Sequence, residues 1–202
     1  RTQKMFDELG IKNIEVKIVK EQRSQIATMT RLKNMIIPGV NLPDRIFHKE
    51  FTRYFFFDND ICSSKDLIET IKTIVVKSFD VHFSADVFSS SEFLFLGQLH
   101  INEDWVTKLA TLSRKMNDDG DYGGLIIIEQ GQRWIVFQKT PVDEGVIGIN
   151  ASKSLETINN LIYENLVDCE VFRKWLRMKS KQDIDLVQTI GKEYLTQLID
   201  NY

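Results

Sequence analysis

Cysteine, proline and glycine are scarce in this chain of 202 residues, which contains 2, 3 and 10 of them respectively. The two cysteines, Cys62 and Cys169, are far apart, and neither stands in a metal-ligand spacing. We therefore expect free thiols in a reducing compartment, the cytoplasm. The low proline and glycine content leaves little room for linkers or disordered tracts. A compact domain is expected, without a disulfide framework or a zinc site.

Long apolar runs are also missing. No run approaches the roughly 18–20 residues that are needed to cross a bilayer. The first ten residues, RTQKMFDELG, do not contain the apolar core of a signal peptide. We therefore expect no membrane partner. Because the chain begins with arginine and not with methionine, we also expect that its natural start is missing.

Common catalytic motifs do not occur in the sequence. It contains no Walker A loop, GxGxxG, HExxH, GxSxG or CxxC motif. The three histidines, His48, His82 and His100, have no ligand spacing among them. This argues against the common nucleotide-dependent, zinc-protease and serine-hydrolase chemistries. Whether the protein is an enzyme stays open at this point, although the balance favours a protein without catalysis, cofactor or metal.

What the chain does have is an uneven distribution of charge. Residues 1–53 contain 11 Lys/Arg and 6 Asp/Glu, whereas residues 54–202 contain 15 and 23. The sign changes close to a loop with two prolines and a glycine at 38–43, which ends a helical pattern. We therefore predict a basic segment at 1–40, which is an appendage or the trimmed remainder of an N-terminal part, and a main α/β domain at 44–202.

Within the basic segment, the pattern of apolar residues predicts a helix, a strand and a second helix. The first helix covers 2–9 and ends at Gly10. Ile14, Val16 and Ile18 then alternate with charged residues, which is typical of a half-buried strand. The second helix covers 21–36.

The segment 123–150 predicts the centre of the main domain. It contains three apolar runs separated by turns at 130–131 and 143–145, which indicates an antiparallel meander. If residue 129 faces residue 132, apolar side chains cover both faces of this sheet. One face carries Leu125, Ile127, Trp134 and Val136, and the other carries Ile126, Ile128, Ile135 and Phe137. A sheet that is apolar on both faces needs helices on both sides.

The other periodic segments complete the predicted fold. Further strands are expected at 51–57, 81–87 and 93–99, and helices at 63–79, 102–116, 154–166, 168–179 and 183–201. In the strand at 81–87, apolar residues alternate with His82, Ser84 and Asp86. The fold class is therefore α/β (α+β), with a central mixed, largely antiparallel sheet covered by helices on both faces and a three-helix C-terminal segment.

Acidic clusters flank the predicted meander, and they lead to the preferred hypothesis for function. Such clusters on a stable scaffold without a catalytic motif are typical of inhibitors, antitoxins and immunity proteins. Acidic surfaces speed association with a basic partner and contribute specificity. We therefore predict a non-catalytic interaction protein that binds a basic protein partner through Asp118, Asp119, Asp121, Glu129, Asp143 and Glu144.

The alternative hypothesis is a metal-dependent nuclease or phosphohydrolase. Asp58 and Asp60 follow a predicted buried strand, and this pair resembles the first motif of haloacid-dehalogenase-type phosphotransferases, which implies a nucleophilic Asp and bound Mg²⁺. That family has Thr or Val two places after the second Asp, where this chain has Cys62. Glu15 and Lys17 on the predicted strand 14–18 resemble the strand motif of PD-(D/E)xK nucleases, which likewise implies Mg²⁺.

A third hypothesis is the binding of nucleic acid. The run 173–181 places basic residues around Trp175 near the end of a predicted helix, where they would also suit the helix dipole. Such a patch could contact phosphates. Its basic residues are Arg173, Lys174, Arg177, Lys179 and Lys181.

Overall fold

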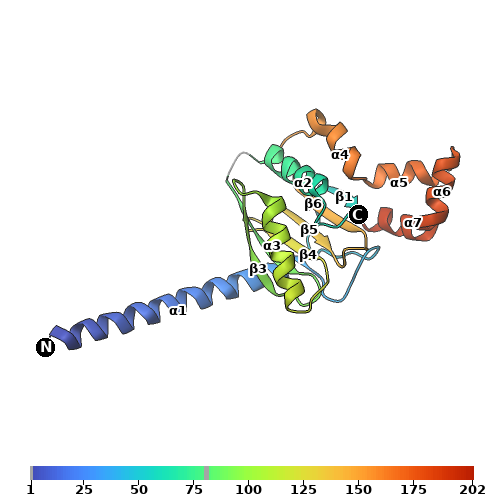
Figure 1. Ribbon diagram of the computed structural model, residues 1–202. Helices are drawn as coiled ribbons and strands as arrows, with labels where there is room; N and C mark the ends of the chain where they lie inside the picture. The colour runs from blue at the N-terminus through green and yellow to red at the C-terminus, as the bar shows by residue number, and fades with distance from the viewer. Residues whose placement is uncertain (1, 80–81) are drawn as a thin grey trace.

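A computed structural model shows one antiparallel sheet with the strand order β1-β6-β5-β4-β2-β3 (Figure 1). The structure describes residues 2–79 and 82–202, without the side chains of residues 2–9 and 11. The six strands in this part of the chain are β1 (Arg53–Phe57), β2 (Ser84–Ser89), β3 (Phe95–His100), β4 (Leu125–Glu129), β5 (Trp134–Gln138) and β6 (Gly145–Ile149). All five pairings are antiparallel. Val81, the first residue of one predicted strand, lies outside the described residues.

Helices cover both faces of the sheet, as predicted. The first face packs against α2 (Lys65–Ser78), α3 (Trp105–Asp118), the short 3-10 helix η1 (Glu156–Ile158) and α4 (Asn159–Asn165). The second face packs against the end of α1 (Thr2–Met35), the segment 36–51, α5 (Cys169–Leu176), α6 (Lys181–Ile190) and α7 (Lys192–Asn201). The helices α5, α6 and α7 also pack on one another. The predicted fold class, including the three-helix C-terminal segment, is confirmed.

The meander β4-β5-β6 confirms the predicted faces, although its first register was predicted wrongly. Ile127 pairs with Val136, which shifts the predicted pairing by two residues. Because side chains alternate with a period of two, a shift of two residues leaves every side chain on its predicted face. Ile127 and Trp134 therefore lie in the first core cluster, while Ile128 and Ile135 lie in the second.

The predicted helix–strand–helix arrangement of segment 1–40 is wrong. Residues 2–35 form the single helix α1, which continues through Gly10 and includes the predicted strand 14–18. A glycine in a helix interior costs about 1 kcal/mol relative to alanine, which is too little to end a helix of good helix formers such as Glu, Lys and Gln. In the part of the chain that the structure describes, no strand lies beside the alternating run 14–18 to pair with it. The division near residue 40 stays a prediction.

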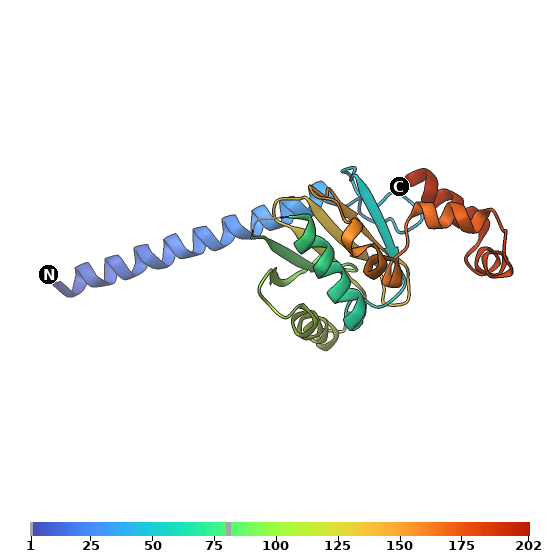
Figure 2. The same ribbon diagram turned by 90° about the horizontal axis from the view of Figure 1, so that it is seen from above.

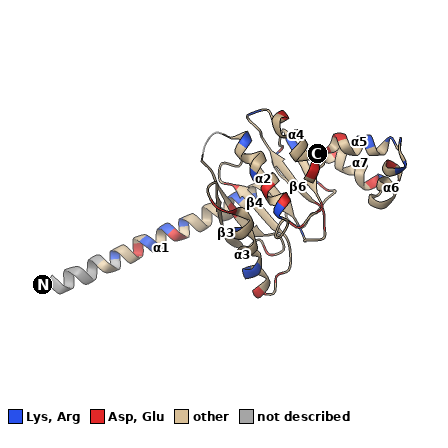
Figure 3. Cartoon of the chain, turned by 45° about the horizontal axis from the view of Figure 1, so that its top comes forward, with Lys and Arg blue, Asp and Glu red and all other residues tan. Residues whose placement is uncertain are grey.

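Most of α1 extends away from the rest of the molecule (Figures 1 and 2). A helix of this length measures about 50 Å, and the side chains of residues 12–27 are exposed. Basic and acidic residues follow one another along this exposed part (Figure 3). In the described part of the chain, no helix is both long enough and apolar enough to cross a membrane.

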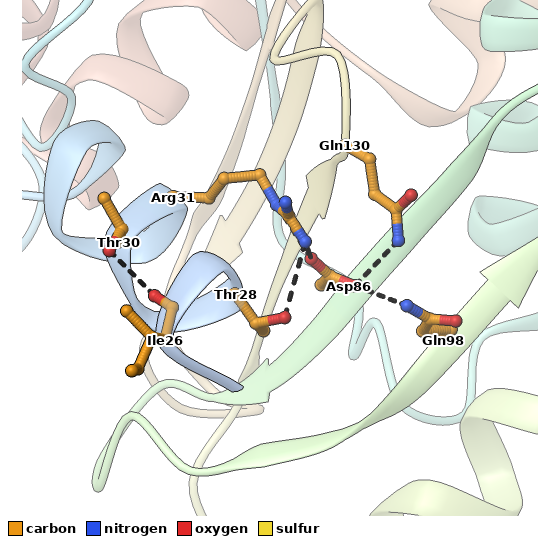
Figure 4. Close-up of polar contacts among 7 residues, drawn as sticks. All are labelled: Ile26, Thr28, Thr30, Arg31, Asp86, Gln98 and Gln130. Atoms are coloured by element: carbon orange, nitrogen blue, oxygen red, sulfur yellow. Dashed lines mark hydrogen bonds and ion pairs between the residues drawn. The ribbon is translucent and has the colours of Figure 1, made fainter. Parts of the chain in front are cut away.

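The last turns of α1 are anchored on the second face of the sheet. Leu32 and Met35 are buried there, and Arg31 forms a two-pronged contact with the buried Asp86 of β2 (Figure 4). The distances from Arg31 Nε and Nη2 to Asp86 Oδ2 are 3.1 and 2.7 Å. The other carboxylate oxygen, Oδ1, accepts hydrogen bonds from the side-chain amides of Gln98 and Gln130. This polar cluster fixes the direction in which α1 leaves the sheet.

Two helix boundaries differ from the predicted ones for local reasons. The predicted helix 183–201 is interrupted at Gly191, whose φ of 104° is accessible to glycine and unfavourable for other residues. The helix predicted to start at Asn102 is capped instead by Asp104, whose side chain accepts from the Thr107 N–H. The cap of α2 is predicted to be Ser63 or Ser64, and the structure shows that it is Ser64.

Candidate binding surface at the acidic end of the sheet

Four loops meet at one end of the sheet, because neighbouring antiparallel strands begin and end there. The last residue of β1, Phe57, pairs with the first residue of β6, Gly145, and that glycine also pairs with the last residue of β5. On the other side, Leu125 at the start of β4 faces Ser89 at the end of β2. The loops at this end are 58–64, 89–94, 118–124 and 139–144, and we call them together the acidic end.

The acidic end has a strong excess of negative charge. Its four loops contain eight carboxylates and one cation, Lys139. Five of these carboxylates are exposed and three are half-buried. The exposed ones are Asp58, Glu92, Asp118, Asp119 and Glu144, and the half-buried ones are Asp60, Asp121 and Asp143. Five of the six residues predicted to bind a partner are thus brought together with three further acids.

Hydrogen bonds inside the acidic end hold its loops in place. The hydroxyl of Ser91 donates to Asp121 at 2.6 Å, and the Gly123 N–H donates to the same carboxylate at 2.9 Å. The loop 118–124 is further tied to the β5–β6 hairpin, since the Gly124 N–H donates to the Lys139 carbonyl at 2.8 Å. A β-carbon on Gly124 would lie 2.1 Å from the Gln138 carbonyl oxygen, so only glycine permits this approach.

A buried glutamine joins two further loops of the acidic end. Gln138 is completely buried. Its Oε1 accepts from the Ile61 N–H at 3.0 Å, and its Nε2 donates to the carbonyls of Asn59 and Asp143 at 3.0 and 2.8 Å. One side chain therefore satisfies three backbone groups and holds the loop after β1 against the β5–β6 hairpin.

Glu129, the sixth residue predicted to bind a partner, does not belong to this surface. It ends β4 at the opposite end of the sheet, and only 3% of the residue is exposed. Its carboxylate accepts from the guanidinium of Arg133 at 2.7 and 3.1 Å and from the Arg133 N–H at 2.9 Å. Glu129 thus fixes the β4–β5 turn, and its carboxylate is already occupied.

The residues of the hydrolase hypothesis do not form a common site. Glu15 and Lys17 lie on α1, where residues two apart point to different sides of a helix, so the predicted strand motif does not exist. Asp60 organises the turn before α2, because its carboxylate accepts from the Cys62 N–H at 2.8 Å and from the Ser63 hydroxyl at 2.7 Å. Among the residues whose side chains the structure describes, His, Cys, Asp and Glu form no group of three with the geometry of a metal site.

The thiol of Cys62 is buried beside this turn, and a low reactivity is predicted for it. Burial is the main cause that raises the pKa of Cys62 from 9.0 to about 12. A rise of three pKa units lowers the thiolate fraction at pH 8 by about 1,000-fold. Labelling of the native protein with Ellman's reagent at pH 8 should therefore leave Cys62 unmodified while a denatured sample reacts at once. Rapid labelling of native Cys62, identified by peptide mapping, would contradict this geometry.

The basic residues predicted to contact nucleic acid lie at the far end of the C-terminal helices. Arg173 and Lys174 are in α5, Lys181 starts α6, and all five basic side chains are exposed. Arg173 pairs with Glu170 one turn earlier on the same helix. The patch stays a prediction, separate from the acidic end.

Local patterns do not assign three acids of the acidic end to this surface. Glu92 is a single acid in a serine turn, and Asp58 and Asp60 together resemble a metal motif. Their place beside Asp121 and Glu144 follows from the strand order, since β1 and β6 pair at one edge while β2 pairs with β4. Strand order is a long-range property, so a local sequence pattern carries no signal for it.

Comparison of the chain with known protein families, with curated proteins and with solved structures found no match. The function is therefore inferred from the surface itself.

Proposed function

We propose that this protein is a non-catalytic interaction protein of the inhibitor, antitoxin or immunity type, which binds a basic partner protein through the acidic end. The observation that carries the proposal is the convergence of four loops with eight carboxylates and one lysine at one end of a rigid sheet. A field of one sign steers an oppositely charged partner and disfavours partners of like charge.

The stiffness of the acidic end supports the same proposal. The loops are held by the hydrogen bonds of Asp121, Asp60 and Gln138, so the backbone that carries the carboxylates is held in place. Binding then costs little ordering of the loops, and a larger part of the interaction energy contributes to affinity. Four adjacent loops can also contribute to an interface of about 800 Å² per partner, the size of a standard protein complex.

The test uses charge reversal on the complete chain. The partner is captured from a nuclease-treated lysate of the native host and identified, and its affinity is measured by biolayer interferometry at two salt concentrations. The double variant Asp118→Lys/Asp119→Lys should weaken binding by at least about tenfold, mainly through slower association. The matched control is Glu156→Lys in η1, an exposed acid that does not belong to the four loops of the acidic end.

The control variant should keep its affinity within about twofold, and the difference between the two variants should shrink as salt screens the charges. An unchanged affinity of the double variant would overturn the proposal. So would a partner whose own binding surface is acidic.

A further inference from the structure

A cavity of about 280 Å³ lies beside the acidic end, where the end of β1 meets the C-terminal helices. Its floor is apolar and buried, and consists of Phe56, Phe172, Leu195 and Leu198. The elements that enclose it come from distant parts of the sequence, because Val167 pairs with Phe56 at the edge of the sheet. The cavity is therefore formed only when the C-terminal helices are docked.

Aromatic side chains form the wall of the cavity. Trp175 and Tyr194 line it and are half-buried, so their rings are in reach of a ligand. The ring of Trp175 packs against Phe172, with 5.5 Å between ring centroids, and Phe172 packs against Phe56 at 5.2 Å. This chain of rings holds the indole in place. The face of an indole ring attracts cations, and arginine guanidinium groups in particular.

Carboxylates surround the mouth of the cavity. Asp58, Glu144 and Glu164 line it and are exposed, and among the described residues no Lys, Arg or His lines the cavity. Across the described chain, none of these three carboxylates is paired with a cation. The Tyr194 hydroxyl donates to Glu144 Oε2 at 3.2 Å and so orients that carboxylate. Burial, followed by the charge of Glu144, raises the pKa of Tyr194, so this hydroxyl keeps its proton.

We propose that this cavity binds an arginine side chain of the partner, an inference that rests on the proposed function. The volume is slightly below the roughly 300–1,000 Å³ of small-molecule pockets, which suits a single side chain. A guanidinium group can stack flat on the indole and donate several hydrogen bonds to carboxylates at the same time. An apolar side chain would leave the charged mouth without a partner, and a lysine would use the flat aromatic wall less well.

The test uses N-acetyl-argininamide as the probe and N-acetyl-citrullinamide as its neutral control of similar shape. Binding to the complete chain is followed through the indole N–H signal of Trp175 in a ¹H–¹⁵N correlation spectrum, assigned with Trp175→Phe. The arginine probe should shift this signal in a saturable way, while the citrulline probe should not. Glu144→Gln should weaken binding of the arginine probe by about tenfold, because one charge-assisted hydrogen bond is lost. Glu156→Gln is the matched control and should bind as the wild type does.

Two results would overturn the inference: equal binding of both probes, or unchanged binding to both Glu144→Gln and Asp58→Asn. Failure of the proposed function is distinguishable from these results. If the arginine probe does not bind but Asp118→Lys/Asp119→Lys still weakens the partner, the cavity has no arginine role and the acidic end remains the binding surface. If the probe binds as described but the partner ignores the double reversal, the proposed function fails.

Discussion

Replacing Arg31 by methionine is expected to lower the free energy of unfolding by about 3–5 kcal/mol, the range for a buried ion pair that loses one member. Asp86 is the reason. Its side chain is completely buried on the second face of the sheet, whereas 21% of the Arg31 side chain is exposed. Without the guanidinium, the carboxylate keeps only the amide donors of Gln98 and Gln130, at 3.0 and 3.3 Å. Two neutral donors cannot replace the solvation that a buried charge has lost.

Substitution of the other member of the pair, Asp86→Leu, should lower the free energy of unfolding by less. The guanidinium of Arg31 is partly exposed and can turn toward water, so this substitution leaves no buried charge without a partner. The double variant Arg31→Met/Asp86→Leu should therefore recover most of the stability lost in Arg31→Met, because a buried ion pair can often be exchanged for apolar residues at little cost. The double-mutant cycle then yields a large coupling energy between the two positions.

These free energies are measured by urea unfolding of the complete chain. Arg23→Met is the matched control, since Arg23 lies on the exposed part of the same helix and should change the stability by no more than about 0.5 kcal/mol. A loss in Arg31→Met no greater than that of this control would mean that α1 is not anchored on Asp86.

The polarity pattern of β2 illustrates what a sequence can and cannot predict. The alternation around Ala85 and Val87 correctly placed these two residues on one face of a strand, because the side-chain period of a strand is local. The same alternation predicts that Asp86 faces solvent. It is buried because α1, more than fifty residues earlier in the chain, covers that face and supplies Arg31. Local periodicity carries no information about such a cover.

In the helix α1, by contrast, a local pattern predicts the wrong secondary structure. Ile14, Val16 and Ile18 have the period of a strand, but a strand is stable only where a neighbouring strand provides hydrogen bonds. None does so for these residues in the described structure, and the surrounding residues form helix readily. So short a pattern of apolar residues is compatible with a helix as well as with a strand, and the absence of a neighbouring strand favours the helix.

The acidic end was predictable in part. The clusters at 118–121 and 143–144 were recognised because both flank the meander, and the antiparallel pairing of β4 and β5 brings their loops together. Glu129 is predicted for the same surface because it directly precedes the predicted turn at 130–131. In an antiparallel meander, however, successive turns lie at opposite ends of the sheet. Glu129 lies at the β4–β5 turn and is therefore far from the β5–β6 turn. Counting the strand direction at each turn would have separated Glu129 from Asp143.

Replacing Gln138 by leucine is expected to lower the free energy of unfolding by at least about 3 kcal/mol, because it leaves three backbone groups without a partner at about 1–3 kcal/mol each. Those groups are the Ile61 N–H and the carbonyls of Asn59 and Asp143. Leucine has a similar volume, so the loss reports hydrogen bonding and not a cavity. Gln197→Leu on the exposed side of α7 is the matched control and should be near neutral.

Gln138→Glu separates hydrogen bonding from packing through its pH dependence. A protonated carboxyl can donate to one of the two carbonyls, whereas a carboxylate beside both is repelled, so folding raises the pKa of the introduced group above its usual 4.3. Since the folded state then holds the proton more tightly than the unfolded state, stability falls as the pH rises above about 4.3. The loss of stability of Gln138→Glu relative to the wild type should therefore grow between pH 4 and pH 7, while that of Gln138→Leu stays constant.

Amide exchange at Ile61 should accelerate in both variants more than at the strand centres, because the loop after β1 separates from the β5–β6 hairpin before the sheet unfolds. A constant loss of stability of Gln138→Glu, or an unchanged exchange rate at Ile61, would show that Gln138 does not hold the two loops together.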